Sequence, residues 1–381
     1  MRKWGGGRGF PHRPSAPGGR RPVPKGGEDG LLRRAVELAV SFLLPVIFLL
    51  ISVPTGFVLE SPGPSFDLQA EIKVEGAEIH PSRGEFLLTS VSLRESNLVY
   101  HLLSVVKDDH RLLQARRFLG EDLDVKAQDR LDGMLTLLSQ EAASVVALRA
   151  ATAEVELHEL GALVLGVVEG SPAHGKLDPG QVIVSVEGIP VRGSEDLGER
   201  IAAAAEGEEV SLGVREVDWE ALESGLEREG DLDPEELLTG EVREVSLLPV
   251  WEEGLGRRVV GVYTRDYFTH RSPVRVTWEM EAVRGPSAGL MMALSLLNLL
   301  LPEDLTRGLK VAGTGEIFPD GRVGPIGGLP MKVRAAEARG AEVFLYPREN
   351  QEDLAGVVTG MRLVPVDSLQ EALDALSAGA E

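Results

Sequence analysis

The stretch RGPSAGLMMAL, residues 284–294, places a serine between a proline and an alanine-glycine step at the start of a long apolar run. Pro286 restricts the backbone of this turn, and the apolar run that begins at Ser287 predicts a buried helix. The first amides of such a helix have no partner inside it and are natural donors to a developing oxyanion. Ala288 and Gly289 are small enough to leave room for a substrate carbonyl group. The pattern therefore makes Ser287 a candidate nucleophile.

The order of residues along the chain limits which base Ser287 can use. Residues 285–289 fit G-x-S-x-G, the nucleophile elbow of α/β-hydrolases, in which the acid and the histidine both follow the serine. No histidine follows Ser287, because the seven histidines lie between positions 12 and 270. This order excludes a lipase or esterase triad of that class. His270 lies upstream in a loop-like segment, and no other feature of the sequence supports it as the base.

A lysine is the better candidate for the base. Only Lys310 and Lys332 follow the serine. Lys310 flanks an apolar strand, where an exposed charge is ordinary, whereas Lys332 opens a predicted helix after a glycine-rich turn, with Pro330 in the first turn. Burial and the positive end of the helix dipole both lower a lysine pKa. A lysine whose pKa falls by about 3 can act as a base near neutral pH.

The segments around these two residues resemble the proteolytic domain of Lon-type serine proteases. The resemblance is carried by GPSAGLMMAL and by residues 305–350, LTRGLKVAGTGEIFPDGRVGPIGGLPMKVRAAEARGAEVFLYPREN. It implies a Ser287–Lys332 dyad, with the two residues 45 positions apart. It also implies that Thr314 orients the lysine, the alternative being an ordinary turn threonine. Arg284 departs from the family pattern, in which Gly or Asp usually precedes GPSAG, and this affects the expected shape and charge of the substrate cleft.

Residues 160–216 resemble the PDZ modules of bacterial proteases. A strand, a GSPA turn, the strand QVIVSVEG, the short helix SEDLGERIAAAAE and the strand EVSLGVRE follow one another in PDZ order. Gln181 is a departure, since an acidic residue usually stands there. A PDZ domain binds an extended peptide as an added strand, although use of the fold as a spacer is the alternative. The resemblance implies a peptide-binding loop at Leu160, Gly161, Ala162 and Leu163.

Composition excludes several classes of function. The chain has no cysteine, which rules out disulfides, thiolate metal sites and cysteine catalysis. Its net charge is -21, and residues 1–34 carry nine of the basic residues, so the remainder is more acidic still and a poor partner for nucleic acid. Residues 170–177, GSPAHGKL, lack the Ser or Thr and the following helix of a nucleotide-binding loop. We therefore expect no ATPase activity, no cofactor and no metal.

Residues 35–59 predict a single membrane anchor. This segment, AVELAVSFLLPVIFLLISVPTGFVL, is apolar apart from Glu37, and about 20 such residues span a bilayer as a helix. No small-x-small cleavage site follows it, which favours a retained anchor over a signal peptide. The basic, Gly- and Pro-rich tail before it reads as disordered and is expected to stay in the cytoplasm, with the rest of the chain extracytoplasmic.

These observations predict an α+β multidomain chain with an N-terminal transmembrane helix, a PDZ domain and a C-terminal Lon-type α/β protease domain. An acidic insert at 217–240 is expected to form a solvated helical excursion. The expected parts are a basic tail at 1–34, the transmembrane helix at 35–59, a β-rich and then helical region at 60–155, the PDZ domain at 156–250 and the proteolytic domain at 251–381.

The resemblance to membrane-anchored, ATP-independent PDZ-Lon proteases implies a serine endopeptidase that cleaves extracytoplasmic peptides or unfolded proteins presented by the PDZ domain. The competing hypothesis is a binding protein, in which a PDZ scaffold is attached to a degenerate protease fold. Arg284 and Gln181 are its best support, and the intact Ser287 and Lys332 oppose it. The sequence leaves open whether the chain forms a homo-oligomer.

Overall fold

The structure is a computed structural model that describes residues 28–106, 109–114, 125–227, 232–280 and 284–378. The predicted basic tail up to residue 27 and part of the acidic insert, residues 228–231, lie outside the described residues. The chain divides into two compact units, Met1–Val53 and Pro54–Glu381, and each is described by itself.

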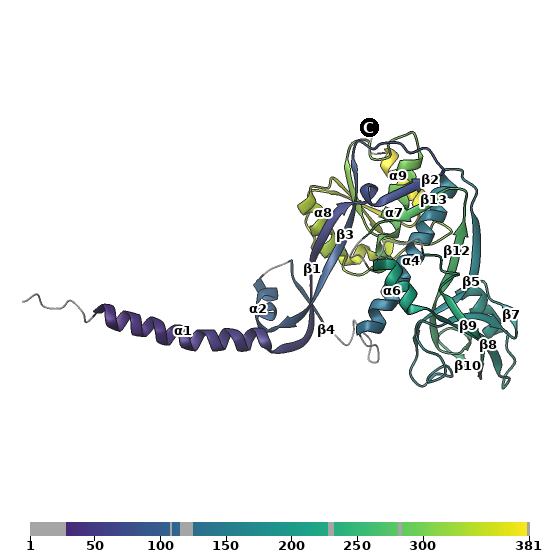
Figure 1. Ribbon diagram of the computed structural model, residues 1–381, viewed down its shortest axis with the longest axis horizontal. Helices are drawn as coiled ribbons and strands as arrows, with labels where there is room; N and C mark the ends of the chain where they lie inside the picture. The colour runs from purple at the N-terminus through teal and green to yellow at the C-terminus, as the bar shows by residue number, and fades with distance from the viewer. Residues whose placement is uncertain (1–27, 107–108, 115–124, 228–231, 281–283, 379–381) are drawn as a thin grey trace, which may run out of the picture. The chain divides into compact units, whose positions relative to one another are not determined.

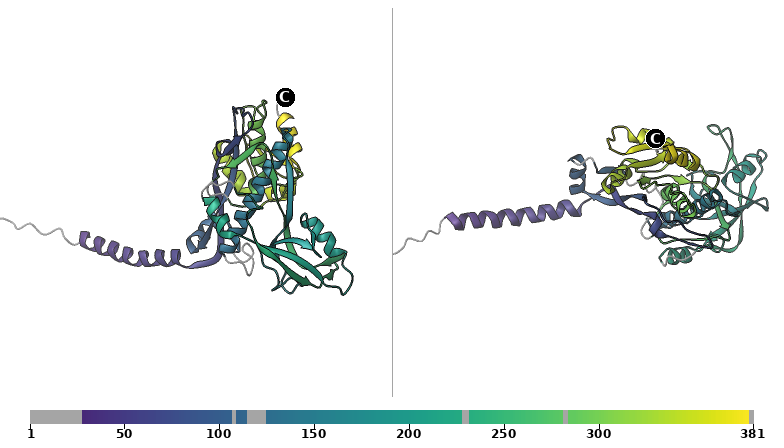
Figure 2. Two further views of the ribbon diagram at one scale, coloured as in Figure 1. Left: turned by 45° about the vertical axis from the view of Figure 1, so that its right-hand side comes forward. Right: turned by 90° about the horizontal axis from the view of Figure 1, so that it is seen from above.

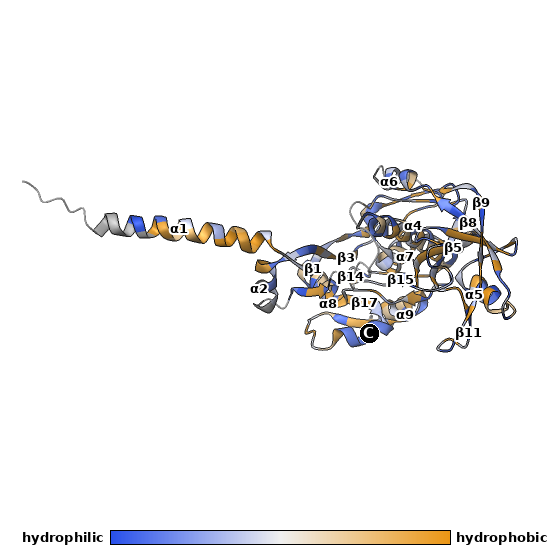
Figure 3. Ribbon diagram, turned by 90° about the horizontal axis from the view of Figure 1, so that it is seen from below, coloured by the Kyte–Doolittle hydropathy of each residue, from blue (hydrophilic) through white to orange (hydrophobic). Residues whose placement is uncertain are grey.

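The first unit contains one long helix, α1, Glu28–Ser52, with Pro45 inside it. Its apolar side chains from Val36 onward are largely exposed, and the helix is predominantly hydrophobic in colour in Figure 3. Within the described part of the chain, no helix has both the length and the apolarity needed to cross a bilayer. The helix is shorter at its C-terminal end than the predicted segment, because α1 ends at Ser52 and residues 54–59 lie in the first strand of the second unit.

A six-stranded sheet forms the centre of the second unit, in the order β18-β17-β14-β3-β1-β4 (Figures 1 and 2). The pairs between β3, β14, β17 and β18 are parallel, and β1 runs antiparallel to both β3 and β4. Strands from the two ends of this unit thus share one sheet, so the region expected to flank the PDZ domain supplies half of the protease sheet. The strands are β1 Pro54–Asp67, β3 Glu85–Asn97, β4 Arg111–Gln114, β14 Lys310–Gly313, β17 Val343–Pro347 and β18 Arg362–Val366.

Helices cover both faces of this sheet, and the alternation of side chains along the strands decides which residues meet them. Phe86 and Leu88 point into a core shared with α4, α7 and α9, whereas Leu87, between them, points into a second core with α8. Helix α7 is buried almost all round, as its apolar sequence requires. The helices are α2 Leu98–Val106, α4 Val125–Ala150, α7 Gly289–Leu300, α8 Leu329–Arg339 and α9 Leu369–Ala378.

Short elements complete this layer and carry the turns of the site. A two-stranded pair joins β2 to β13, and another joins β15 to β16. Their bounds are η1 Leu68–Glu71, β2 Ile72–Glu75, β13 Arg275–Trp278, η2 Pro286–Ala288, β15 Glu316–Ile317, β16 Val323–Gly324 and η3 Arg348–Leu354.

A second sheet, in the order β12-β5-β6-β8-β9, forms the module that the sequence predicts as a PDZ domain, here called the PDZ module, and has its own apolar core with helix α5. Strand β12 is an outer strand of this sheet, so the module extends to residue 271 and not to the expected boundary at 250. The elements are β5 Glu156–Val167, β6 Val182–Val186, β7 Ile189–Pro190, α5 Ser194–Ala202, β8 Val210–Val217, α6 Trp219–Glu227, β9 Leu238–Leu247, β10 Val250–Glu252, β11 Arg257–Val259 and β12 Val262–Arg271.

Helix α4 packs against both sheets and joins the two modules. Its C-terminal half contributes Ala143 and Ala147 to the protease core, and its N-terminal half contributes Met134 and Leu137 to a cluster with the PDZ strands. Helix α6, from the acidic insert, enters the same cluster through the fully buried Leu222. Val217, Leu237 and Leu238 of the insert are buried in the same cluster, so the prediction of a solvated helical excursion is wrong for the described part of the insert.

Candidate active site

Ser287 lies in the short turn η2, immediately before α7. Gly285 opens the turn with φ of 93°, a left-handed conformation that favours glycine, and its N–H donates to Thr136 Oγ1 at 2.8 Å. Ser139 Oγ donates to the carbonyl of Pro286 at 3.1 Å. Both polar partners lie on α4, about 150 residues earlier in the chain. Helix α4 thus fixes the turn that presents the serine.

Lys332 meets this serine from the first turn of α8. The helix starts after Gly328, whose φ is 73°, and Pro330 occupies its first turn as the sequence predicts. The Lys332 side chain is buried, with a residue exposure of 3%. Its Nζ lies 2.7 Å from Ser287 Oγ and 3.1 Å from Thr314 Oγ1. The structure therefore brings the predicted nucleophile, base and orienting threonine into one hydrogen-bonded group.

Thr314 connects the serine turn to the lysine. Its hydroxyl donates to the backbone carbonyl of Ser287 at 2.9 Å, and the N–H of Gly315 donates to the same carbonyl at 2.9 Å. Because the single hydroxyl proton is used in that bond, Thr314 Oγ1 accepts from Lys332. A neutral Lys332 that donates to Thr314 keeps one lone pair, which can point at the hydroxyl proton of Ser287.

The environment of Lys332 favours its neutral form. Burial lowers the pKa of Lys332 to about 8, and the negative field of Glu60 opposes this by raising it. Arg284 is exposed and is not among the groups that shift the Lys332 pKa. Its positive field instead acts on Asp132, whose pKa burial raises. The amine is half neutral near pH 8.

The residues after Ser287 serve packing more than substrate access. Ala288 is buried in the protease core. A side chain on Gly289 would meet Ile317 Cγ2 and Ser139 Oγ, each at 2.7 Å, so the glycine allows close contact of α7 with β15 and α4. The amides of Gly289 and Leu290 donate to Pro286 and Gly315 carbonyls. The expected oxyanion donors are therefore partly occupied, which leaves the amides of Ser287 and Ala288 as the candidates.

The predicted PDZ peptide loop is wrong. Residues 160–163 do not form a loop but lie inside strand β5, which is paired along this stretch with β12 and, at Ala162 and Leu163, with β6 as well. Ala162, for example, pairs with both Asp266 and Ile183. No edge is open there to a peptide strand. Local sequence could not reveal this, because a central strand and a strand beside a binding loop have similar apolar patterns.

A groove of about 860 Å³ lies elsewhere in the PDZ module, between α5 and the start of the outer strand β12. Leu197, Gly198 and Ile201 of α5 line it, together with the β10–β11 hairpin and Tyr263 of β12. Gly261, with φ of 80°, turns the chain into β12. In the sequence, the segment VVGV at residues 259–262 indicates the start of this outer strand, because an apolar pair and a glycine stand directly before it.

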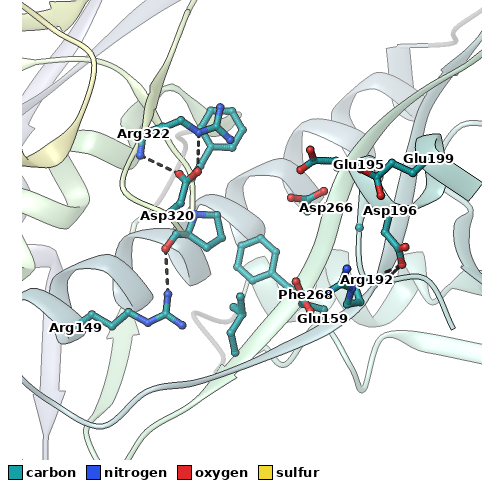
Figure 4. Close-up of a pocket in the computed structure, with 14 residues that line it drawn as sticks. Arg149, Glu159, Arg192, Glu195, Asp196, Glu199, Asp266, Phe268, Asp320 and Arg322 are labelled. Carbon is teal, nitrogen blue, oxygen red and sulfur yellow. Dashed lines mark hydrogen bonds and ion pairs between the residues drawn. The ribbon is translucent and has the colours of Figure 1, made fainter. Parts of the chain in front are cut away.

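A second hollow, of about 540 Å³, lies between α5 and the turn after β15 (Figure 4). Glu195, Glu199 and Asp266 lie on its PDZ side, and Asp320 and Arg322 lie on its protease side. A smaller neighbouring hollow is lined by Pro286, next to the candidate nucleophile. The two hollows share Asp266, Phe268, Phe318 and Pro319 as lining residues, so they are neighbours in the protein.

Arg265 of the outer PDZ strand ties that strand to the site. Its guanidinium forms an ion pair with Glu316, two residues after Thr314, and lies 4.8 Å from the ring centre of Phe318. Arg322 also lies 4.8 Å from this ring centre. Two cations against one aromatic ring stabilise the turn after β15 at the boundary of the modules.

Comparison with known families agrees with both modules. Residues 272–378 match the Lon protease (S16) C-terminal proteolytic domain, and residues 163–216 match a PDZ domain. The chain is 39% identical over 94 residues to Lon protease 2 of Bacillus subtilis and 43% identical over 94 residues to Lon protease of Xanthomonas oryzae. Each match covers 24% of this chain, but only 16% and 11% of those relatives. The predicted resemblance to a Lon proteolytic domain and a PDZ domain is confirmed.

Among solved structures, the PDZ domain of an SdrC-like protein from Listeria innocua is similar over 27% of this chain and 92% of its own length, at 20% identity and a TM-score of 0.20.

Proposed function

We propose that this chain is an ATP-independent serine endopeptidase in which Ser287 is the nucleophile and Lys332 the general base. One observation carries the proposal: a buried lysine amine with a lowered pKa lies 2.7 Å from the serine hydroxyl. A nucleophile within hydrogen-bond reach of a base that a third group orients is the arrangement of covalent catalysis. The matches to Lon proteolytic domains support the same chemistry.

The reaction follows from the geometry. Neutral Lys332 removes the hydroxyl proton of Ser287 while Oγ attacks the peptide carbonyl carbon, and the carbonyl oxygen becomes an oxyanion facing backbone amides of the serine turn. The Lys332 ammonium then gives its proton to the leaving amine as the C–N bond breaks, which leaves an ester on Ser287. Lys332, neutral again, takes a proton from water as the water oxygen attacks the ester carbonyl carbon, and it returns that proton to Ser287 Oγ when the acyl C–O bond breaks and the acid product leaves. Thr314 keeps the amine directed at Ser287 throughout.

The pH dependence of hydrolysis tests the lysine base. We expect kcat/KM for a peptide to rise with pH to a half-maximal value near pH 8, because the free enzyme is active only with Lys332 neutral. The measurement is initial rates of cleavage of an internally quenched peptide between pH 6 and 10. A half-maximal value near pH 6.5, the ordinary range of histidine, would contradict a lysine base.

The PDZ module is proposed to present substrates through the groove between α5 and β12. An outer strand beside a helix is the arrangement to which an extended peptide adds as a further strand. Exposed apolar residues that line the groove, among them Val250, Leu255 and Tyr263, suit apolar peptide side chains. This proposal concerns polypeptide substrates long enough to reach the groove while a scissile bond lies at Ser287.

Gly198→Phe is expected to block the groove, since Gly198 lines it from α5. We expect KM for an unfolded protein substrate to rise about tenfold, equivalent to ~1.4 kcal/mol of lost binding, with kcat/KM for a short peptide unchanged. Ala203→Phe, at the exposed end of the same helix, is the matched control. Equal loss on short and long substrates would indicate damage to the site instead of lost presentation.

Helix α1 is proposed to anchor the chain in the membrane, with the basic tail cytoplasmic and residues after 53 extracytoplasmic. The support is the exposure of its apolar side chains, which water does not favour, and the Arg33 and Arg34 pair before them. Release of the full-length chain from membranes by alkaline carbonate would contradict the anchor.

A further inference from the structure

Glu60 is a buried acid that the mechanism above does not use. It lies in β1 with 4% exposure. Its Oε1 would lie only 2.6 Å from a Cβ built on Gly328, the residue that precedes α8. The carboxyl group therefore packs directly on the backbone at the start of the helix that carries Lys332. Only a glycine at 328 leaves space for it.

The surroundings of Glu60 offset part of the cost of burying its charge. Burial raises the pKa of Glu60, whereas the positive fields of Arg111 and Lys332 lower it. Arg111 is its cross-strand neighbour on β4, and Lys332 is one turn into α8. The N-terminus of α8 adds the positive end of a helix dipole. Cationic groups on β4 and α8 and this dipole thus all act on one carboxyl group.

Glu60 and Lys332 each shift the pKa of the other through their opposite charges. Among the described residues, Glu60 is the charged group that acts on the pKa of Lys332, which it raises against the effect of burial. The other neighbours of the amine are the hydroxyl groups of Ser287 and Thr314, which carry no charge near neutral pH. The charged residues Glu337 and Arg339 of α8 lie on its exposed side.

We propose that Glu60 is the positioning residue of the general base: its carboxylate stabilises the Lys332 ammonium that forms when the amine takes the Ser287 proton. This inference rests on the proposed function. The transition state creates a positive charge in a site from which water is excluded, and such a charge needs a fixed negative partner. In serine enzymes with a histidine base, a buried aspartate stabilises the imidazolium in the same way.

The proposal predicts two opposed effects of Glu60→Gln, which removes the charge and keeps the shape. The Lys332 pKa should fall by about 1, because loss of an opposite charge favours the neutral amine. The half-maximal pH of kcat/KM should fall with it. The plateau kcat should fall about tenfold, because the ammonium in the transition state loses its partner. A purely structural role would lower activity without moving the pH profile.

The experiment combines the pH profile with a direct titration of the Lys332 13Cε chemical shift in full-length protein labelled with [13C]lysine. Glu95→Gln, an exposed acid on the neighbouring strand β3, is the matched control and should change neither quantity. Glu60→Asp, which keeps a carboxylate, should restore most of the shift and serves if Glu60→Gln fails to fold. An unchanged Lys332 pKa in folded Glu60→Gln overturns the proposal. Absence of peptidase activity in the unmodified protein would overturn the proposed function, while the titration would still decide the interaction of Glu60 with Lys332.

Discussion

Ser287→Ala is expected to lower kcat/KM for peptide hydrolysis by at least about 10³-fold, or ~4 kcal/mol of transition-state stabilisation. The variant removes the atom that forms the acyl bond. The backbone that holds the turn is untouched, because its bonds run through the Ser287 carbonyl to Thr314 and Gly315. Lys332 keeps its hydrogen bond to Thr314. Activity should therefore be lost without a change in thermal unfolding.

The same helix supplies a matched control. Ser295 is fully buried on α7, and its Oγ has no hydrogen-bond partner among the described residues. Ser295→Ala removes an equivalent hydroxyl away from the turn and should leave kcat/KM within about twofold. Rates are measured on one quenched peptide with all three proteins. Retention of a tenth or more of the activity in Ser287→Ala would refute Ser287 as the nucleophile.

Lys332→Met is expected to abolish activity to a similar extent and to stabilise the fold. At pH 7 the lysine is protonated in the unfolded chain and mostly protonated in the folded one, where burial penalises the charge. The difference between a pKa of 10.5 unfolded and about 8 folded corresponds to ~3 kcal/mol of destabilisation. Methionine fills the space without a charge. We expect a gain of about 1–3 kcal/mol, because Glu60 loses its partner and protonates more readily.

The pH dependence of this gain has a definite sign. Between pH 8 and 10.5 the unfolded chain binds the lysine proton and the folded chain does not, so the stability of the unmodified protein rises with pH there. The advantage of Lys332→Met should therefore shrink from pH 7 to pH 10 in denaturant unfolding. Lys310→Met, which breaks a surface pair with Glu85, should change stability by less than about 1 kcal/mol. A Lys332→Met protein less stable than its parent at pH 7 would contradict a buried, destabilising amine.

The sequence predicted the site residues whose chemistry is marked by a short local motif. Ser287 precedes a buried helix and Lys332 opens another, so motif and chain order sufficed to pair these two as a hypothesis, and the resemblance to Lon-type proteases added Thr314. The structure places them within hydrogen-bond distance, and their catalytic roles stay predictions.

Features that depend on long-range pairing escaped prediction. Strand β12 was assigned to the protease domain because nothing local shows that it pairs with β5, and residues 160–163 were taken for a loop for the same reason. Glu60 gave no signal either, since a single acid after an apolar helix is ordinary on a surface strand. Its importance arises only because β1 passes the start of α8.

The interleaved strand order also sets the order in which the molecule can form. The PDZ module occupies the interval between the two halves of the protease sheet, and Thr89 on β3 bonds Gly313 on β14 across 224 positions. During synthesis, β1 and β3 emerge long before their parallel partners exist, whereas the PDZ strands find theirs within a much shorter stretch. The central sheet therefore closes last. The effective length of the chain segment between its two halves is shorter by then, because the PDZ module within that segment has already folded. A nascent chain can bring Ser287 and Lys332 together only after the PDZ module has been made and α8 has emerged, so the pair that we propose as catalytic forms after the PDZ module.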